Sequence, residues 1–219
     1  MKNVLMSGAS SGIGKAIKEV LENDGYKVFN IGRNNACINC DLNELDILEI
    51  EVKKWLKENE INVLINCAGI GVFEPHECLS LKQIKNLINV NLTAPILLTN
   101  LCLRSLQKTK GHIINITSIE ATKHSKYSAL YTATKSGLRD FSLSLFEEVR
   151  KNGIKVTSIN PDITNTSFFD NLKFEPNSGD KDTFLEASTI ANAVKDILHI
   201  NGVVSDITIR PQKVGVNKK

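Results

Sequence analysis

Apolar and polar positions along the chain follow two alternating patterns, which predict strands and helices in turn. Short apolar runs without helical spacing indicate strands at residues 4–6, 26–31, 36–40, 61–67, 111–117, 154–159 and 203–209. Between them, apolar residues recur every three or four positions and indicate helices at residues 14–24, 43–60, 80–89, 94–107, 129–151 and 185–200. Strands that alternate with helices predict a parallel sheet with helices on both faces.

The length of 219 residues suits one domain, and no internal repeat divides the chain. We therefore expect an α/β fold with a doubly wound parallel sheet of about seven strands over residues 1–212. Residues 164–183 have no clean period, and residues 213–219 are expected to form a flexible tail. Open parallel sheets bind ligands beyond the carboxyl ends of their strands, so functional residues are expected just after strands.

The composition is that of an ordinary globular protein, with 42% hydrophobic and 23% charged residues. The 27 basic and 24 acidic residues leave a net charge of +3, which gives no reason to expect nucleic acid or an anionic membrane as a partner. No apolar run approaches the ~20 residues that span a bilayer, and the N-terminus lacks a signal-peptide pattern, so we expect a cytoplasmic protein. The five cysteines and scattered histidines show no metal-ligand spacing, so no metal site is expected.

A glycine-rich loop joins the first predicted strand to the first predicted helix. A helix N-terminus offers free N–H groups and the positive end of the helix dipole, and glycines let the backbone approach a phosphate closely. The strand before the loop and the helix after it satisfy the context that a dinucleotide-binding motif requires. We expect the loop to hold a pyrophosphate through six residues: Gly8, Ser10, Ser11, Gly12, Ile13 and Gly14.

The end of the second predicted strand selects the coenzyme. An acidic residue there would bind the ribose 2′-hydroxyl of NAD and repel the 2′-phosphate of NADP. The stretch Asn30–Asn34 has no carboxylate, and the guanidinium of Arg33 can bind a phosphate through two hydrogen bonds. We therefore expect NADP(H); the alternative is that Arg33 is a solvated loop residue.

A tyrosine and a lysine one helical turn apart are the candidate acid–base pair. Tyr131 and Lys135 share one face of the helix predicted at residues 129–151. A phenol has a pKa near ~10, and a close ammonium is expected to lower that pKa and give a tuned proton donor and acceptor. Ser118 follows the strand predicted at residues 111–117, where a substrate would bind, and Asn91 lies between two predicted helices.

These motifs, in this order and at these spacings, resemble the classical branch of the short-chain dehydrogenase/reductase family from about Lys2 to Pro211. Ser7–Gly14 is similar to the family pattern Thr-Gly-x-x-x-Gly-Ile-Gly, and Asn66–Gly69 is similar to Asn-Asn-Ala-Gly. The resemblance implies a Rossmann-type fold with a substrate lid at about residues 164–184. It also implies hydride transfer between NADP(H) and a substrate carbon, with four catalytic residues: Asn91, Ser118, Tyr131 and Lys135.

The resemblance also implies a role for each of these residues. Tyr131 would exchange a proton with the substrate oxygen, and Ser118 would orient that oxygen. Lys135 would hold the nicotinamide ribose, and Asn91 would place a water that links Lys135 to solvent. Asp162 stands where the family has a glycine, in a turn that aspartate can form in the left-handed conformation. Besides Tyr131 and Lys135, further coenzyme contacts are implied for Asp41, Leu42, Asn66, Ala68, Gly69, Pro161, Ile163, Thr164 and Thr166.

The leading hypothesis is a ketone or aldehyde reductase, or alcohol dehydrogenase, with a small-molecule substrate. The alternatives are a 3-oxoacyl thioester reductase and a non-catalytic NADP-binding regulatory protein.

The resemblance implies a homodimer or homotetramer built on the helices at residues 94–107 and 129–151. Phenylalanines of the lid either line an apolar pocket or pack the lid onto the body, and Phe73 and Glu120 are further pocket candidates.

Overall fold

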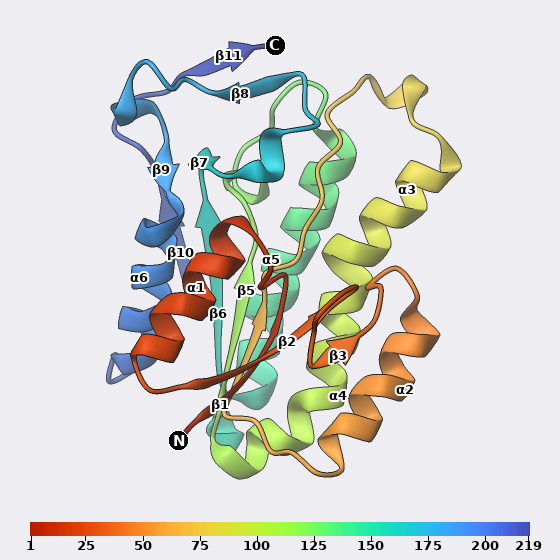
Figure 1. Ribbon diagram of the computed structural model, residues 1–219, viewed down its shortest axis with the longest axis vertical. Helices are drawn as coiled ribbons and strands as arrows, with labels where there is room; N and C mark the ends of the chain where they lie inside the picture. Colours follow the sequence, from red (N-terminus) through yellow and green to blue (C-terminus); the bar gives the residue numbers. More distant parts are fainter.

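A seven-stranded parallel sheet forms the centre of the structure, a computed structural model that describes residues 1–219 (Figure 1). The strands lie side by side in the order β10-β6-β5-β4-β1-β2-β3. Their bounds are β1 Asn3–Ser7, β2 Lys27–Gly32, β3 Ile38–Asn39, β4 Val63–Asn66, β5 His112–Ile116, β6 Lys155–Pro161 and β10 Asp206–Ile209. The direction of winding reverses between β1 and β4, which is where doubly wound sheets bind ligands. The predicted α/β fold is confirmed.

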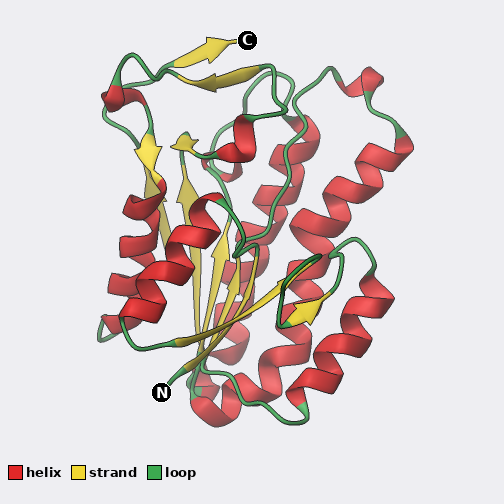
Figure 2. Ribbon diagram, in the orientation of Figure 1, coloured by secondary structure: helices red, strands yellow, loops and turns green.

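Helices cover both faces of this sheet (Figure 2). On one face α1 packs against α6, and on the other α2 packs against α4, which in turn contacts α5. The helix bounds are α1 Gly12–Asn23, α2 Leu45–Leu56, α3 Leu81–Ile88, α4 Ala94–Thr109, α5 Ala129–Val149 and α6 Ala187–His199. The predicted helices therefore all exist, with ends that differ by a few residues because helix termini depend on local capping.

Two hydrophobic cores lie on the two faces of the sheet. Along β1, Val4 and Met6 point into the core beneath α1 and α6, where they meet Ile17. Leu5, which lies between them, points into the opposite core with Leu48 of α2. Successive side chains of a strand point to opposite faces. The uninterrupted apolar runs seen in the sequence are therefore those of strands buried on both faces.

Asn91 lies within a long helical stretch. A π-helical turn, Asn89–Thr93, joins α3 to α4, so that helical structure is continuous from Leu81 to Thr109. This stretch has 29 residues with a mean hydropathy of 1.3 in its most apolar part, so by length and composition alone it could cross a membrane. It packs against α2 and α5, and 44% of that apolar part is buried, as in the core helix of a globular protein. Single π-helical turns occur frequently at functional sites.

The lid, residues 164–184, and the C-terminus together cover the carboxyl edge of the sheet, at the top of Figure 1. In the lid, β7 Thr164–Asn165 pairs with β9 Leu185–Glu186 and leads to β8 Phe174–Pro176. The sequence predicts a flexible tail at residues 213–219, but β11 Val216–Lys218 pairs antiparallel with β8. Lys213 Nζ lies 3.0 Å from two lid carboxylates, and Lys219 Nζ donates to the carbonyl oxygen of Phe169 at 2.7 Å. We call residues 213–219 the C-terminal strap.

Candidate active site

The glycine-rich loop packs against the segments that follow β4 and β6. Gly8 has a φ of +77°, and a Cβ there would lie 2.6 Å from the amide nitrogen of Ala68. Gly12 has a φ of +51°, and a Cβ there would lie 3.1 Å from the side chain of Thr166. Ser7 Oγ accepts a hydrogen bond from the N–H of Ala68 at 3.3 Å. Three segments that are distant in the sequence therefore border one space, and only glycine fits where they meet.

The N-terminus of α1 opens into this space and is suited to an anion. Its N-cap residue, Ser11, makes no side-chain capping hydrogen bond, and the first turn holds no acidic residue. The first N–H groups of a helix have no partner within the helix and attract phosphate. The loop, from Gly8 to Gly14, therefore fits the pyrophosphate of a dinucleotide.

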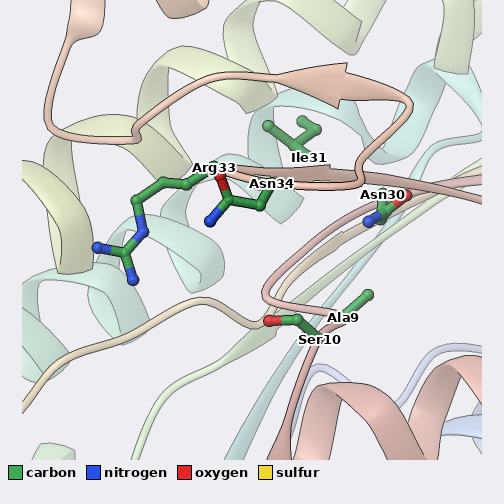
Figure 3. A pocket seen from close by; sticks show the side chains of 7 residues that line it. Ala9, Ser10, Asn30, Ile31, Arg33 and Asn34 are labelled. Atoms are coloured by element: carbon green, nitrogen blue, oxygen red, sulfur yellow. The ribbon is translucent and has the colours of Figure 1, made fainter.

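A hollow of about 150 Å³ lies between the glycine-rich loop and the end of β2. Figure 3 shows Ser10 on one side of it and Arg33 and Asn34 on the other. Arg33 is exposed, and its guanidinium forms no ion pair, unlike those of Arg139, Arg150 and Arg210. The cation is therefore available to an anionic group bound beside the loop.

The residues expected near the adenine and the ribose differ in their surroundings. Asp41 is exposed after β3, where it accepts a hydrogen bond from the N–H of Asn43 at 2.9 Å, and Leu42 beside it is half-buried. Asn66 instead has its side chain inside the protein, where Nδ2 donates to Asn115 Oδ1 at 2.8 Å. The Asn66 side chain therefore joins β4 to β5, and only its backbone is left to face a coenzyme.

The segment after β6 differs from its prediction at Asp162. Its backbone is not left-handed, since the non-glycine residues with positive φ are Asn35, Lys110 and Tyr127. The buried Asp162 carboxylate instead accepts the N–H of Ile163 at 2.9 Å and Arg210 Nε at 3.0 Å. The turn therefore forms without the left-handed conformation, and the Arg210 guanidinium neutralises the carboxylate beside Pro161, Ile163 and Thr164.

Tyr131 and Lys135 lie on the buried face of α5, near its N-terminal end. Lys135 Nζ lies 5.9 Å from the centroid of the Tyr131 ring and donates to the carbonyl oxygen of Ile116 at 3.1 Å. A Cβ on Gly69 would lie 3.2 Å from Lys135 Nζ. Since Gly69 follows Ala68, which contacts the glycine-rich loop, the ammonium lies next to the space proposed for the dinucleotide.

Burial sets the protonation of this pair. Desolvation raises the pKa of Tyr131 to about 12; the Ser118 hydroxyl acts against this shift, and the negative charge of Glu120 adds to it. Desolvation also lowers the pKa of the Lys135 ammonium to about 8. The sequence predicts that Lys135 lowers the pKa of the phenol, but the shift in this structure is set by the lost hydration of the phenolate, with Ser118 and Glu120, and Lys135 is not among its causes. Tyr131 is therefore protonated at neutral pH.

Asn91 holds the loop against which Lys135 lies. Its side chain is fully buried in the π-helical turn. Oδ1 accepts the N–H of Ile70, and Nδ2 donates to the carbonyl oxygen of Ile70, both at 2.9 Å. Ile70 follows Gly69, so Asn91 fixes the backbone beside the lysine. The water-placing role of Asn91 stays a prediction.

Ser118 and Tyr131 come together although they lie on different elements. Ser118 follows β5 and begins the short turn Ile119–Ala121. Its Oγ accepts the N–H of Glu120 at 3.2 Å, so its own proton stays free to be donated. The Ser118 hydroxyl acts to lower the pKa of Tyr131, so it lies near the phenol.

Aromatic rings cover Tyr131 on the side of the lid. The ring of Phe73, from the loop after β4, lies 5.0 Å from that of Tyr131, and the ring of Phe168 lies 6.2 Å away. Phe174 of β8 packs on Phe73 at 5.1 Å. In this structure the lid phenylalanines therefore pack the lid onto the active site. The support that Lys219 gives to this lid could not be predicted from the sequence, since a three-residue strand carries no periodic signal.

Comparison with known proteins agrees with this geometry. A sequence profile described as short chain dehydrogenase matches residues 36–176. An uncharacterized oxidoreductase of Staphylococcus epidermidis is 30% identical over 230 residues, covering 96% of this chain and 97% of that protein.

Two solved structures share the fold over nearly the whole chain. An alcohol dehydrogenase from the archaeon Thermococcus sibiricus, complexed with 5-hydroxy-NADP, has a TM-score of 0.87 at 24% identity and covers 98% of this chain and 99% of its own. A 4-hydroxyisoleucine dehydrogenase complexed with NADH has a TM-score of 0.83 at 23% identity and covers 96% of this chain and 98% of its own. The chain therefore belongs to the short-chain dehydrogenase family of oxidoreductases.

Proposed function

We propose that the protein uses NADP(H) to interconvert a ketone or aldehyde and its alcohol. The observation that carries this proposal is the buried pair of Tyr131 and Lys135 beside Ser118, at the carboxyl edge of the sheet. The coenzyme supplies the hydride, and the chain supplies binding, orientation and the proton.

In the reductive direction, Tyr131 donates its phenolic proton to the substrate oxygen. The raised pKa of about 12 keeps that proton in place at neutral pH. Ser118 donates a second hydrogen bond to the same oxygen and orients it. The carbon gains a hydride and the oxygen gains a proton, which gives the alcohol; the phenolate left on Tyr131 is stabilised by the Lys135 ammonium and is reprotonated from solvent.

The choice of NADP(H) rests on Arg33. The structure of the Thermococcus sibiricus enzyme contains 5-hydroxy-NADP and that of 4-hydroxyisoleucine dehydrogenase contains NADH, so the fold accepts both kinds of coenzyme. In this chain, the residues that line the hollow beside the glycine-rich loop include one cation and no carboxylate. A 2′-phosphate there would gain a charge-assisted hydrogen bond from Arg33.

The rest of the substrate would lie against the aromatic rings of the lid. Phe73 and Phe168 flank Tyr131 and carry no charge, which favours an apolar substituent on the carbonyl carbon. Half-buried apolar side chains on α4 and α5 support a homodimer or homotetramer built on these helices; they are Leu97, Leu101, Phe141 and Phe146.

The test is turnover by the wild type and by Tyr131→Phe. NADPH oxidation would be followed with a panel of ketones and aldehydes, and NADPH affinity by calorimetry. The variant keeps the ring that packs on Phe73, so it is expected to fold and bind NADPH normally while kcat falls by about 100- to 10,000-fold. Equal turnover by the variant would contradict the role of Tyr131. NADPH binding without turnover of any compound would favour a regulatory protein.

A further inference from the structure

Glu120 is a buried carboxylate whose side-chain hydrogen bonds all go to one short segment, residues 125–132. The sequence suggests it as a pocket residue, but its side chain points to residues 125–132. Oε1 accepts from Ser125 Oγ at 2.6 Å, and Oε2 accepts from the N–H of Ser125 at 3.2 Å and from Ser128 Oγ at 2.9 Å. Thr132 Oγ1 also donates to Oε2, at 3.2 Å. Lys123 Nζ lies 3.8 Å from Oε1 on the outer side, and only 8% of the Glu120 side chain is exposed.

These bonds join the two segments that carry the reacting hydroxyls. On one side, the N–H of Glu120 donates to Ser118 Oγ, so Glu120 lies on the turn that Ser118 begins. On the other side, Ser128 is the N-cap residue of α5, and Thr132 follows Tyr131 directly. The carboxylate therefore connects the turn after β5 to the first turn of α5.

The segment between the turn after β5 and the start of α5 has a strained backbone, which the hydrogen bonds of Glu120 support. Tyr127 has a φ of +66°, in the left-handed region that bulky side chains avoid. A strained residue of this kind persists where the surrounding contacts over-determine the backbone. Glu120 supplies contacts on both sides of it, at Ser125 and Ser128.

We propose that Glu120 is a positioning residue that holds the hydroxyls of Ser118 and Tyr131 at the separation needed to bind one substrate oxygen. This inference rests on the proposed function. Both hydroxyls must reach the same atom, and catalysis is sensitive to displacements of about 1 Å. A carboxylate suits this task because it accepts bonds from four donors and donates none.

The charge of Glu120 affects the pH dependence of the reaction, which would not change if Glu120 only supported the fold. The charged groups that face Tyr131 are Glu120, from the turn after β5, and Lys135, from α5; the Phe73 and Phe168 rings that pack on it from the other segments are uncharged. The negative charge of Glu120 raises the pKa of Tyr131. Its removal lowers that pKa, so the alkaline limb that belongs to Tyr131, which lies above the step expected from Lys135 near its pKa of about 8, moves to lower pH.

The experiment compares Glu120→Gln, Glu120→Asp and the control Glu147→Gln, which makes the same change on the exposed surface of α5. In Glu120→Gln an amide nitrogen replaces one carboxylate oxygen and cannot accept a hydrogen bond. Some of the donors at Ser125, Ser128 and Thr132 therefore lose their acceptor. We expect kcat for ketone reduction to fall about 10- to 100-fold with an unchanged affinity for NADPH, and the alkaline limb to shift downward. Glu120→Asp keeps the charge on a shorter side chain, so kcat falls but the alkaline limb stays in place. Glu147→Gln is expected to match the wild type.

Two results would overturn the proposal. One is a Glu120→Gln variant with the kcat and the pH profile of the wild type. The other is a crystal structure of that variant in which the Ser118 and Tyr131 hydroxyls keep their wild-type separation. The crystal structure does not depend on turnover, so it decides the positioning role even if the wild type reduces none of the carbonyl compounds. In that case the proposed function fails separately. Unchanged NADPH binding shows that each variant has folded.

Discussion

Replacement of Arg33 by methionine is expected to reduce the preference for NADPH over NADH without harming the fold. Arg33 is exposed and forms no ion pair within the chain, so its replacement costs the folded protein no ion pair. A hydrogen bond to a charged group contributes about 1.5–3 kcal/mol, which corresponds to about 10- to 150-fold in affinity. Because salt screens exposed charges, we expect the lower end of this range at physiological ionic strength and a larger effect in dilute buffer.

The assay measures kcat/KM for NADPH and for NADH at one saturating substrate concentration, at low and at high salt. In Arg33→Met, kcat/KM for NADPH should fall while that for NADH stays within about two-fold, since the 2′-phosphate is the only group that differs. The control is Arg150→Met, which removes an exposed guanidinium just beyond the C-terminal end of α5. If the NADPH to NADH ratio is the same in Arg33→Met and in the wild type, Arg33 does not bind the phosphate and the choice of coenzyme must be made elsewhere.

Two further predictions concern stability and the lid. Burial lowers the pKa of His112 to about 3, so between that value and the ordinary pKa near 6.5 the unfolded chain binds a proton that the folded protein excludes. The free energy of unfolding, measured in urea, should therefore fall by about 2 kcal/mol from pH 7 to pH 5, and the fall should be smaller in His112→Gln. If the wild type and the variant lose the same free energy over this range, His112 is not the cause. Removal of residues 213–219 takes away β11 and the Lys219 bonds to the lid, so KM for the carbonyl substrate should rise several-fold. The midpoint of thermal unfolding should change little, because exposed ion pairs contribute little stability, and an unchanged KM would show that the strap does not hold the lid.

The local features of this protein could be read from short stretches of its sequence. The apolar run at the start of the chain, the glycines after it and the four-residue spacing of Tyr131 and Lys135 each depend on a backbone period or a conformational preference within a few residues. The order of strands and helices then leaves few ways to wind a parallel sheet, because its crossovers are short and right-handed. Fold class and the edge of the sheet that carries the site therefore followed from patterns along the chain.

What surrounds each side chain depends on residues far away in the chain. The pKa of Tyr131 is raised because Phe73 and Phe168 bury it, and no local pattern tells how much water they exclude. The strap forms a strand because the lid offers it unpaired backbone groups and carboxylates, and the buried Asp162 carboxylate finds its cation in Arg210, 48 residues further along the chain. Desolvation, ion pairing and strand addition are properties of groups brought together by folding, so they become visible only when the neighbours are in place.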